Sequence, residues 1–264
     1  MVSVEDFWIN CSDIESQVSK FIRDKIESAG LRGAILAVSG GIDSAVALNC
    51  TVEAVGSEKV IAIHMPESDI TPHSDTTDVM LHCESLGVTC NLVDITEMLH
   101  VIQKNLPFFD PEDMVVYGNI KSRTRMMVSY YFANKFKRMV IGTSNKTELL
   151  TGFFTKYGDG GVDIMPLADL YKTQIRQFAR YLEIPDNIIS KAPSPGFFPG
   201  QTDEKELGVN YETLDLVLLS LHKGVKKETI SKQLRIELSQ VKSIAERVKV
   251  NRHKREFPTI LRLS

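Results

Sequence analysis

Six small and polar residues, Ser-Gly-Gly-Ile-Asp-Ser at positions 39–44, are the part of this sequence whose types and spacing most clearly suggest chemistry. They directly follow the apolar run 34–38, and the apolar residues after them have helical spacing. Glycine lets a backbone approach an anion closely, and the first turn of a helix offers unpaired N–H groups. The 39–44 loop therefore predicts a binding site for a polyphosphate.

Asp43 is the unusual member of this loop, because a carboxylate repels phosphate unless a cation lies between them. A Mg²⁺ ion that bridges the carboxylate and the phosphates accounts for it. The loop lacks the Gly-Lys-Ser/Thr ending of the common ATPase loop, so it is a different motif. A plain strand-to-helix turn capped by Ser44 is the alternative interpretation.

A second polar segment, residues 142–148, follows the short apolar run 139–141 and repeats the strand–loop–helix pattern. Thr143 is suited to donate to a phosphate or to adenine. Glu148 lies about one helical turn further on, where it is expected to face Asp43. Two such carboxylates, with phosphate oxygens, predict a site for a hard cation. Capping of its own helix is the alternative role for Glu148.

Two lysines and one arginine are candidates for contacts with anions. Lys156 lies in a loop rich in glycine and aspartate, and Lys172 begins a predicted helix. Either lysine would supply the positive charge that a leaving pyrophosphate needs. Arg123 shares a predicted helical face with Met126 and Met127, which favours a phosphate or carboxylate partner. A side chain that only faces solvent is the alternative for each.

Short apolar runs that alternate with helical patterns predict an α/β fold. Strands are expected at 34–38, 60–64, 88–93 and 139–141, and helices at 4–29, 43–55, 74–86, 119–136 and 171–182. This alternation predicts a doubly wound parallel sheet with helices on both faces and strands buried on both sides. Ligands of such sheets bind at the carboxyl ends of the strands, where both polar segments lie.

Composition excludes several classes of protein. The chain has 264 residues, 43% of them apolar, which suits one large domain or one domain with a small appendage. A net charge of −3 argues against a nucleic-acid partner, and no apolar run is long enough to span a membrane. The N-terminus has no signal pattern, and the four cysteines form no Cys-x-x-Cys pair. We therefore expect a cytoplasmic protein.

Taken together, these segments resemble the ammonia-dependent NAD synthetases of the N-type ATP pyrophosphatase superfamily. The most specific stretches are 39–44, 119–126, 142–148, 152–163, 166–172 and 193–208. The first motif marks only the superfamily, whereas the combination is specific to this family. The resemblance implies a Rossmann-like fold of the adenine nucleotide alpha hydrolase type. It also implies one NAD synthetase domain over 1–264, with a core at about 30–190 and a C-terminal helical region at about 203–264.

The resemblance also implies a reaction in two steps. ATP adenylates the nicotinate carboxylate of deamido-NAD and releases pyrophosphate, and ammonia then attacks the acyl adenylate to give NAD and AMP. This is a ligase reaction, the final step of NAD biosynthesis. Water must be kept from the adenylate, which gives the proline-rich 192–201 loop a role as a lid. The residues before position 34 are too few for a glutaminase domain, so free ammonia is expected.

Site residues follow from the same resemblance. ATP would contact Ala37, Val38, Ser39, Gly40, Gly41, Ile42, Asp43, Ser44, Thr143, Lys172 and Ser194. Deamido-NAD would contact Arg123, Lys156, Asp163, His253 and Lys254. Asp43 and Glu148 would hold Mg²⁺, and Asp43 and Lys172 would be catalytic through their charge. The family implies a homodimer that binds deamido-NAD across its interface.

Two other classes of function remain as alternatives. One is a different adenylating enzyme of the superfamily, such as a GMP-forming amidase partner or a tRNA thiolase. A thiolase would show cysteine pairs and a basic surface, which this sequence lacks. The other is a nucleotide-binding sensor or structural protein without turnover. Such a protein would keep the 39–44 loop but would not need Asp43, Glu148, Lys156 and Lys172 together.

Overall fold

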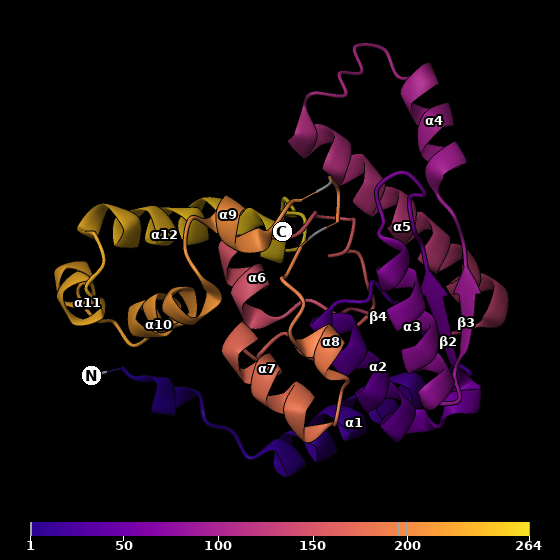
Figure 1. Ribbon diagram of the computed structural model, residues 1–264, viewed down its shortest axis with the longest axis horizontal. Coiled ribbons are helices and arrows are strands. Elements are labelled where there is room, and N and C mark those ends of the chain that lie inside the picture. Colours follow the sequence, from indigo (N-terminus) through magenta and orange to yellow (C-terminus); the bar gives the residue numbers. More distant parts are fainter. Residues whose placement is uncertain (1, 195, 199, 264) are drawn as a thin grey trace.

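A four-stranded parallel sheet with the order β3-β2-β1-β4 lies at the centre of the computed structural model, which describes residues 2–194, 196–198 and 200–263 (Figure 1). Its strands are β1 (Ala34–Ala37), β2 (Val60–His64), β3 (Thr89–Leu92) and β4 (Met139–Ile141). β1 pairs with both β2 and β4. This order places a topological switch point between β1 and β4, where sheets of this kind bind ligands.

Helices cover both faces of the sheet, as the sequence predicts. One face packs against α1 (Cys11–Ser28), α2 (Ile42–Val55), α3 (His73–Ser85), α7 (Lys172–Tyr181) and α8 (Asp186–Ile189). The other face packs against α4 (Thr96–Asn105) and α5 (Met114–Phe136). Successive side chains of β1 point to opposite faces of the sheet, so Leu36 packs in the core on the first face and Ile35 in the core on the other. The predicted doubly wound fold is confirmed.

Several predicted elements differ in detail from the structure. The single helix expected at 4–29 is a short 3₁₀ turn, η1 (Val4–Phe7), followed by α1, whose N-cap Asn10 accepts a hydrogen bond from Asp13 N. Strand β3 is not buried on both faces, because it lies at the edge of the sheet and Leu92 is 57% exposed. Helix α4 was not predicted, and α5 begins earlier than expected because Asp113 caps it.

The chain from residue 203 onward forms a separate cluster of helices, at the left of Figure 1. It contains α9 (Asp203–Leu207), α10 (Tyr211–His222), α11 (Lys227–Leu234), α12 (Leu238–Val250) and the 3₁₀ turn η3 (Asn251–Arg255). Their apolar core also takes in Phe7 and Tyr171. Helix α10 packs against α7 and against α6 (Lys146–Thr151), which follows β4. The cluster is therefore attached to the elements that leave the carboxyl ends of the sheet.

The remaining segments are short or extended. The 3₁₀ turn η2 (Ser57–Lys59) leads into β2. Residues 192–194, 196–198 and 200–201 of the 192–201 loop have no helix or strand, as predicted, whereas Pro195 and Pro199 lie outside the described residues. Among the described residues, no helix is both long enough and apolar enough to span a membrane.

Candidate functional site

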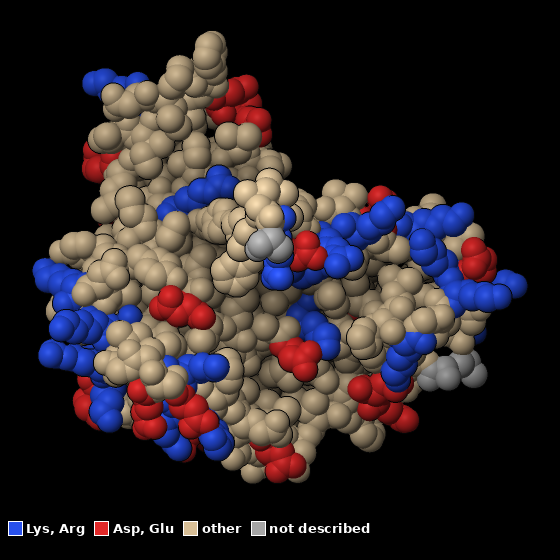
Figure 2. All heavy atoms as spheres, turned by 180° about the vertical axis from the view of Figure 1, so that it is seen from behind, with Lys and Arg blue, Asp and Glu red and all other residues tan. Residues whose placement is uncertain are grey.

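A pocket of about 510 Å³ lies at the carboxyl ends of β1, β2 and β4. Every residue predicted to contact ATP lines it, including the whole of 37–44, Thr143, Lys172 and Ser194. Glu148 also lines it, and the 192–201 loop contributes further residues. From behind, the surface is hollowed between the C-terminal helices and the rest of the chain, with charged side chains around the hollow (Figure 2).

The 39–44 loop turns sharply from β1 into α2. Gly40 has φ +82°, and a Cβ there would lie 3.1 Å from the carbonyl oxygen of Asp75. Gly41 has φ −91°, so only Gly40 uses the conformational freedom that we expected of both glycines. Ser44 does not cap α2 but donates from Oγ to Gly41 O over 2.8 Å. The first turn of α2 thus keeps its amide groups available for an anion.

Three charged side chains meet where β1 and β4 end. The Lys172 ammonium is only 2% exposed and forms ion pairs with Asp43 and, at 3.4 Å, with Glu148 Oε1. Burial lowers the pKa of Lys172, but the two carboxylates outweigh this effect and raise it. Burial and then the charge of Asp43 raise the pKa of Glu148 to about 8. Glu148 is therefore protonated below about pH 8, and its carboxyl adds negative charge to the cluster only above that pH.

Glu148 also has the capping role that we considered as its alternative. Its Oε2 accepts a hydrogen bond from Asn145 N over 3.2 Å, and Asn145 Oδ1 accepts one from Glu148 N over 3.0 Å. The two roles are compatible because the capping oxygen is Oε2, whereas Oε1 faces Lys172. The cap fixes the direction in which the carboxylate points.

A third carboxylate, that of Asp203, lines the same pocket although the residue is only 4% exposed. Its Oδ2 accepts a hydrogen bond from the Tyr211 hydroxyl over 2.6 Å. Its Oδ1 has no hydrogen-bond partner among the described residues. Burial raises the pKa of Asp203, while the charge of Lys172 opposes that effect. Within the described part of the chain, no three Asp, Glu, His or Cys side chains are arranged to hold a metal ion by themselves.

Asp215 of α10 fixes the two helices that carry Glu148 and Lys172. Its Oδ1 accepts from Thr147 Oγ1 over 2.5 Å, and its Oδ2 accepts from Thr173 N and Thr173 Oγ1 over 2.8 and 2.7 Å. Thr147 Oγ1 in turn accepts from Lys172 N over 3.0 Å. A fully buried carboxylate thus joins the first turns of α6 and α7.

Lys191 and His64 also line the pocket, although neither is among the predicted site residues. Lys191 donates to Asp75 Oδ1 and Asp78 Oδ2 over 3.0 and 2.7 Å. His64 bonds through Nδ1 to Val38 O over 2.8 Å, and burial lowers its pKa, so a neutral imidazole supports the start of the loop. Arg125 also lines the pocket. The sequence predicts Arg123 on an apolar helical face, but Arg123 is exposed, whereas Arg125 is partly buried.

The residues predicted to bind deamido-NAD lie outside this pocket, next to the C-terminal turn η3. Lys156 Nζ donates to His253 O over 2.7 Å, and Lys254 Nζ donates to Gly152 O over 2.8 Å. Arg123 reaches Lys156 O over 3.3 Å. Asp163 is nearer to the sheet, where its carboxylate accepts from Val140 N over 2.8 Å. The structure thus brings Arg123, Lys156, His253 and Lys254 together but not into the pocket.

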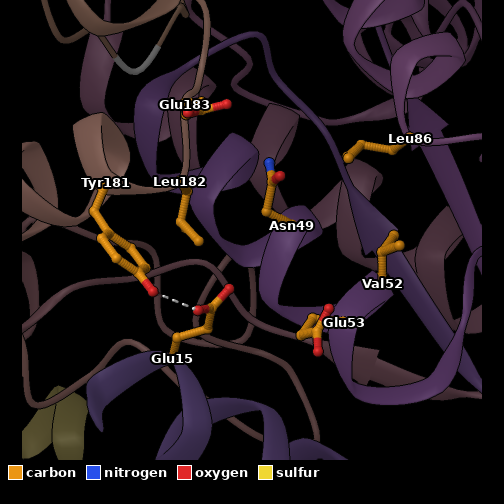
Figure 3. Close-up of a pocket in the computed structure, with 8 residues that line it drawn as sticks. All are labelled: Glu15, Asn49, Val52, Glu53, Leu86, Tyr181, Leu182 and Glu183. Atoms are coloured by element: carbon orange, nitrogen blue, oxygen red, sulfur yellow. Dashed lines mark hydrogen bonds between the residues drawn. The ribbon is translucent and has the colours of Figure 1, made fainter. Parts of the chain in front are cut away.

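A second pocket, of about 390 Å³, lies between α1, α2 and α7 (Figure 3). Glu15, Glu53 and Glu183 line it, and the Tyr181 hydroxyl donates to Glu15 Oε2 over 3.1 Å. Three carboxylates repel the phosphates of a nucleotide. None of the predicted site residues lines this pocket, so the pocket at the strand ends is the candidate site.

Comparison with known proteins agrees with this geometry. A family model described as NAD synthase matches residues 14–258. An NH(3)-dependent NAD(+) synthetase of Methanococcoides burtonii is 47% identical over 91% of this chain and 91% of its own. The chain superposes with a TM-score of 0.84 on a structure of NMN synthetase from Francisella tularensis, at 30% identity, covering 96% of this chain and 99% of that one. An NH3-dependent NAD synthetase from Campylobacter jejuni gives a TM-score of 0.81 at 28% identity, over 96% and 100%.

Proposed function

The chain belongs to the NAD synthase family, and from that premise we propose that its strand-end pocket carries out the ammonia-dependent amidation of deamido-NAD. ATP is the co-substrate, the products are NAD, AMP and pyrophosphate, and the reaction is the final step of NAD biosynthesis. The enzyme is a ligase that forms a C–N bond. We further propose that residues 1–264 work as one domain, since Asp215 of the C-terminal helices supports the residues of the pocket.

One observation carries this proposal: the 39–44 loop and the Asp43–Lys172–Glu148 cluster line a single pocket. Open amide groups at the start of α2 suit the triphosphate of ATP. A buried lysine beside them suits the negative charge that develops as pyrophosphate leaves. No sensor or scaffold needs a lysine buried with two carboxylates at a phosphate loop, so the cluster favours catalysis over simple binding.

We propose that Mg²⁺ binds with ATP, held by Asp43, Glu148 and phosphate oxygens. The residues fit this role because both carboxyl groups converge on one point, now taken by the Lys172 ammonium, and a cation bound there would favour the ionised form of Glu148. Mg²⁺ is usually held by one or two carboxylates together with substrate phosphates. When bound, the ion would neutralise charge on the phosphates.

The residues of the chain act on the reaction through position and charge. The 39–44 loop and Lys172 orient the phosphates so that the nicotinate carboxylate meets the α-phosphate in line. Lys172 then balances the charge on the departing pyrophosphate. Ammonia attacks the acyl carbon, AMP leaves with one of the former carboxylate oxygens, and one proton is released as the amide forms. Phe197 and Phe198 of the 192–201 loop line the pocket and exclude water.

We also propose that a homodimer completes the site for deamido-NAD. Arg123, Lys156, His253 and Lys254 lie together outside the pocket, as expected if they contact a substrate shared between two copies. Large apolar side chains are exposed along α4, α5 and the segment that joins them, which suits an interface: Val101, Leu106, Phe108, Met114, Val115, Val116, Met127, Tyr131 and Phe136.

The direct test is an assay with ATP, Mg²⁺, deamido-NAD and an ammonium salt. We expect NAD and AMP in equal amounts. Nicotinate mononucleotide is the matched alternative substrate, because one similar structure is that of an NMN synthetase. Formation of ADP, or a preference for nicotinate mononucleotide over deamido-NAD, would contradict the proposal. Glutamine in place of ammonium is expected to support no comparable activity.

A further inference from the structure

We propose that Lys121 of α5 is a positioning residue that holds Phe197 and Phe198 of the 192–201 loop in the wall of the pocket and so protects the acyl adenylate from water. The inference deepens the proposed function and rests on it. Lys121 is 1% exposed, although it carries a charge and belongs to none of the predicted site residues. A buried lysine is costly unless its ammonium has partners of opposite charge or with hydrogen-bond acceptors.

The first partner of Lys121 is the backbone of the 192–201 loop. Its Nζ donates a hydrogen bond to Phe197 O over 2.8 Å. A hydrogen bond from a charged donor is stronger than one between neutral groups. The bond spans 76 positions of sequence, so it is a tertiary contact that exists only while the loop lies against α5.

Aromatic rings of the loop and of α5 surround the same ammonium. Nζ lies 5.1 Å from the centroid of the Phe198 ring and 4.3 Å from that of Tyr117. The Phe197 ring lies against Gly118, where a Cβ would come within 2.7 Å of Phe197 Cδ2. Helix α5 therefore provides the Lys121 ammonium for the carbonyl of Phe197 and, at Gly118, the space for the Phe197 ring.

Glu67 balances the charge of Lys121. Its Oε2 lies 2.7 Å from Lys121 Nζ, and the residue is 7% exposed. Glu67 follows β2, so the pair joins a strand end to α5 and, through Phe197 O, to the loop. A buried ion pair often adds little to the stability of a protein, because removing both charges from water is costly. The main effect that we assign to the Lys121–Glu67 pair is therefore to hold the loop.

Water and ammonia compete for the acyl adenylate. Attack by water on the acyl carbon returns the nicotinate carboxylate and releases AMP and two protons, so ATP is consumed without formation of NAD. Attack by ammonia gives NAD and AMP. Phe197 and Phe198 line the pocket, so a loop held by Lys121 keeps apolar rings between bulk water and the adenylate.

The test measures the ratio of AMP to NAD at limiting ammonium for the wild type and for Lys121→Met. We expect a ratio near one for the wild type. In the variant, AMP formed in excess of NAD should rise about tenfold, the factor that corresponds to the loss of one hydrogen bond from a charged group. A residue that only stabilises the fold would lower both products together.

Two more variants separate the loop from folding, because Lys121→Met leaves the Glu67 carboxylate unpaired inside the protein. Lys121→Met combined with Glu67→Gln removes both charges. Gly118→Ala keeps the charges and displaces the Phe197 ring, in a helix that alanine favours. Both are expected to show excess AMP. Lys223→Met, which removes an exposed ion pair with Asp6, is the control and should keep the wild-type ratio.

The outcomes distinguish the inference from the function on which it rests. If the wild type forms no NAD, the proposed function is wrong, and so is the role proposed for Lys121. If the wild type forms NAD while Lys121→Met, the double variant and Gly118→Ala all keep its AMP-to-NAD ratio, Lys121 does not protect the adenylate and the proposed function stands.

Discussion

Asn145 Nδ2 donates a hydrogen bond to Asp43 Oδ1 over 2.8 Å, although the two residues are 102 positions apart. The bond joins the loop after β4 to the first turn of the helix after β1. Because Asn145 also caps α6, it sets the positions of Asp43 and Glu148 at once. The two carboxylates on which the account depends are therefore held by one amide side chain at the switch point of the sheet.

The variant Asp43→Asn is expected to lower the rate of NAD formation by at least about 100-fold, since it removes the carboxylate charge that is proposed to hold Mg²⁺ at the phosphates. It should also reduce stability by about 1–3 kcal/mol, because buried Lys172 loses one of its two carboxylate partners. Steady-state kinetics and chemical unfolding measure the two effects. Asp169→Asn, at a side chain 96% exposed, is the control. Wild-type turnover in Asp43→Asn would contradict the assigned role.

The raised pKa of Glu148 predicts a dependence of stability on pH. Its pKa in the folded protein is about 8, against an ordinary value of 4.5, so the folded state holds this proton more tightly than the unfolded chain does. The stabilisation is complete below the ordinary value and is lost as the pH rises through the folded value.

Unfolding by urea, without ATP or Mg²⁺, measures this dependence. Between about pH 5 and about pH 8, the wild type should lose about 1–3 kcal/mol more stability than Glu148→Gln. The glutamine has no proton to lose in this range. Parallel pH profiles for the two proteins would show that Glu148 titrates at an ordinary pKa.

The variant Asp215→Asn is expected to lower kcat more than it raises the KM for ATP. The carboxylate holds Thr147 and Thr173, the neighbours of Glu148 and Lys172, so its loss shifts the charged cluster rather than the phosphate loop. A stability loss of about 2 kcal/mol should accompany the change. Thr173→Ser keeps the hydroxyl and is the control. An unchanged kcat despite lower stability would make Asp215 purely structural.

The variant Lys156→Met tests whether the surface beside η3 binds deamido-NAD. We expect the KM for deamido-NAD to rise about tenfold, as for the loss of one contact to an anion, with the KM for ATP unchanged. Lys156 lies outside the ATP pocket, so the two substrates should respond differently. Lys226→Met, in the C-terminal helices, serves as the matched lysine control. An equal rise in both KM values would argue against a separate subsite.

The variant Val115→Asp tests the proposed dimer. Val115 is 74% exposed at the start of α5, and a carboxylate there should weaken an apolar interface. We expect the dissociation constant of the dimer to rise at least about tenfold. Analytical ultracentrifugation measures it, with Val250→Asp as the control at an exposed valine on α12. A wild-type protein that sediments as a monomer at all concentrations would refute the dimer.

Local sequence pattern was sufficient for the parts of the fold and site that depend on neighbouring residues. Strands β2 and β4 have the predicted bounds, because short apolar β-branched runs suit a buried parallel sheet. The 39–44 loop and Glu148 were found because each follows such a strand. The prediction that β3 is buried on both faces was wrong, because β3 lies at the edge of the sheet. The order of the strands cannot be predicted from a local sequence pattern.

Contacts between distant segments were not predictable in the same way. Asp215 acts on Thr147 from 68 positions away, and nothing in its helix distinguishes it from a surface aspartate. His64 and Lys191 likewise gain their roles from the packing of α3 beside the 39–44 loop. Lys172 was recognised as a candidate, but its position between two carboxylates required the sheet order.

Transfer of oxygen from deamido-NAD to AMP is the sharpest test that the nicotinate carboxylate is adenylated. Deamido-NAD labelled with oxygen-18 in its nicotinate carboxylate is incubated with the enzyme, ATP, Mg²⁺ and ammonium, and the AMP is analysed by mass spectrometry. We expect one labelled oxygen in the AMP phosphate for each NAD formed, because the carboxylate attacks the α-phosphate. Unlabelled AMP, or ADP as the nucleotide product, would contradict it.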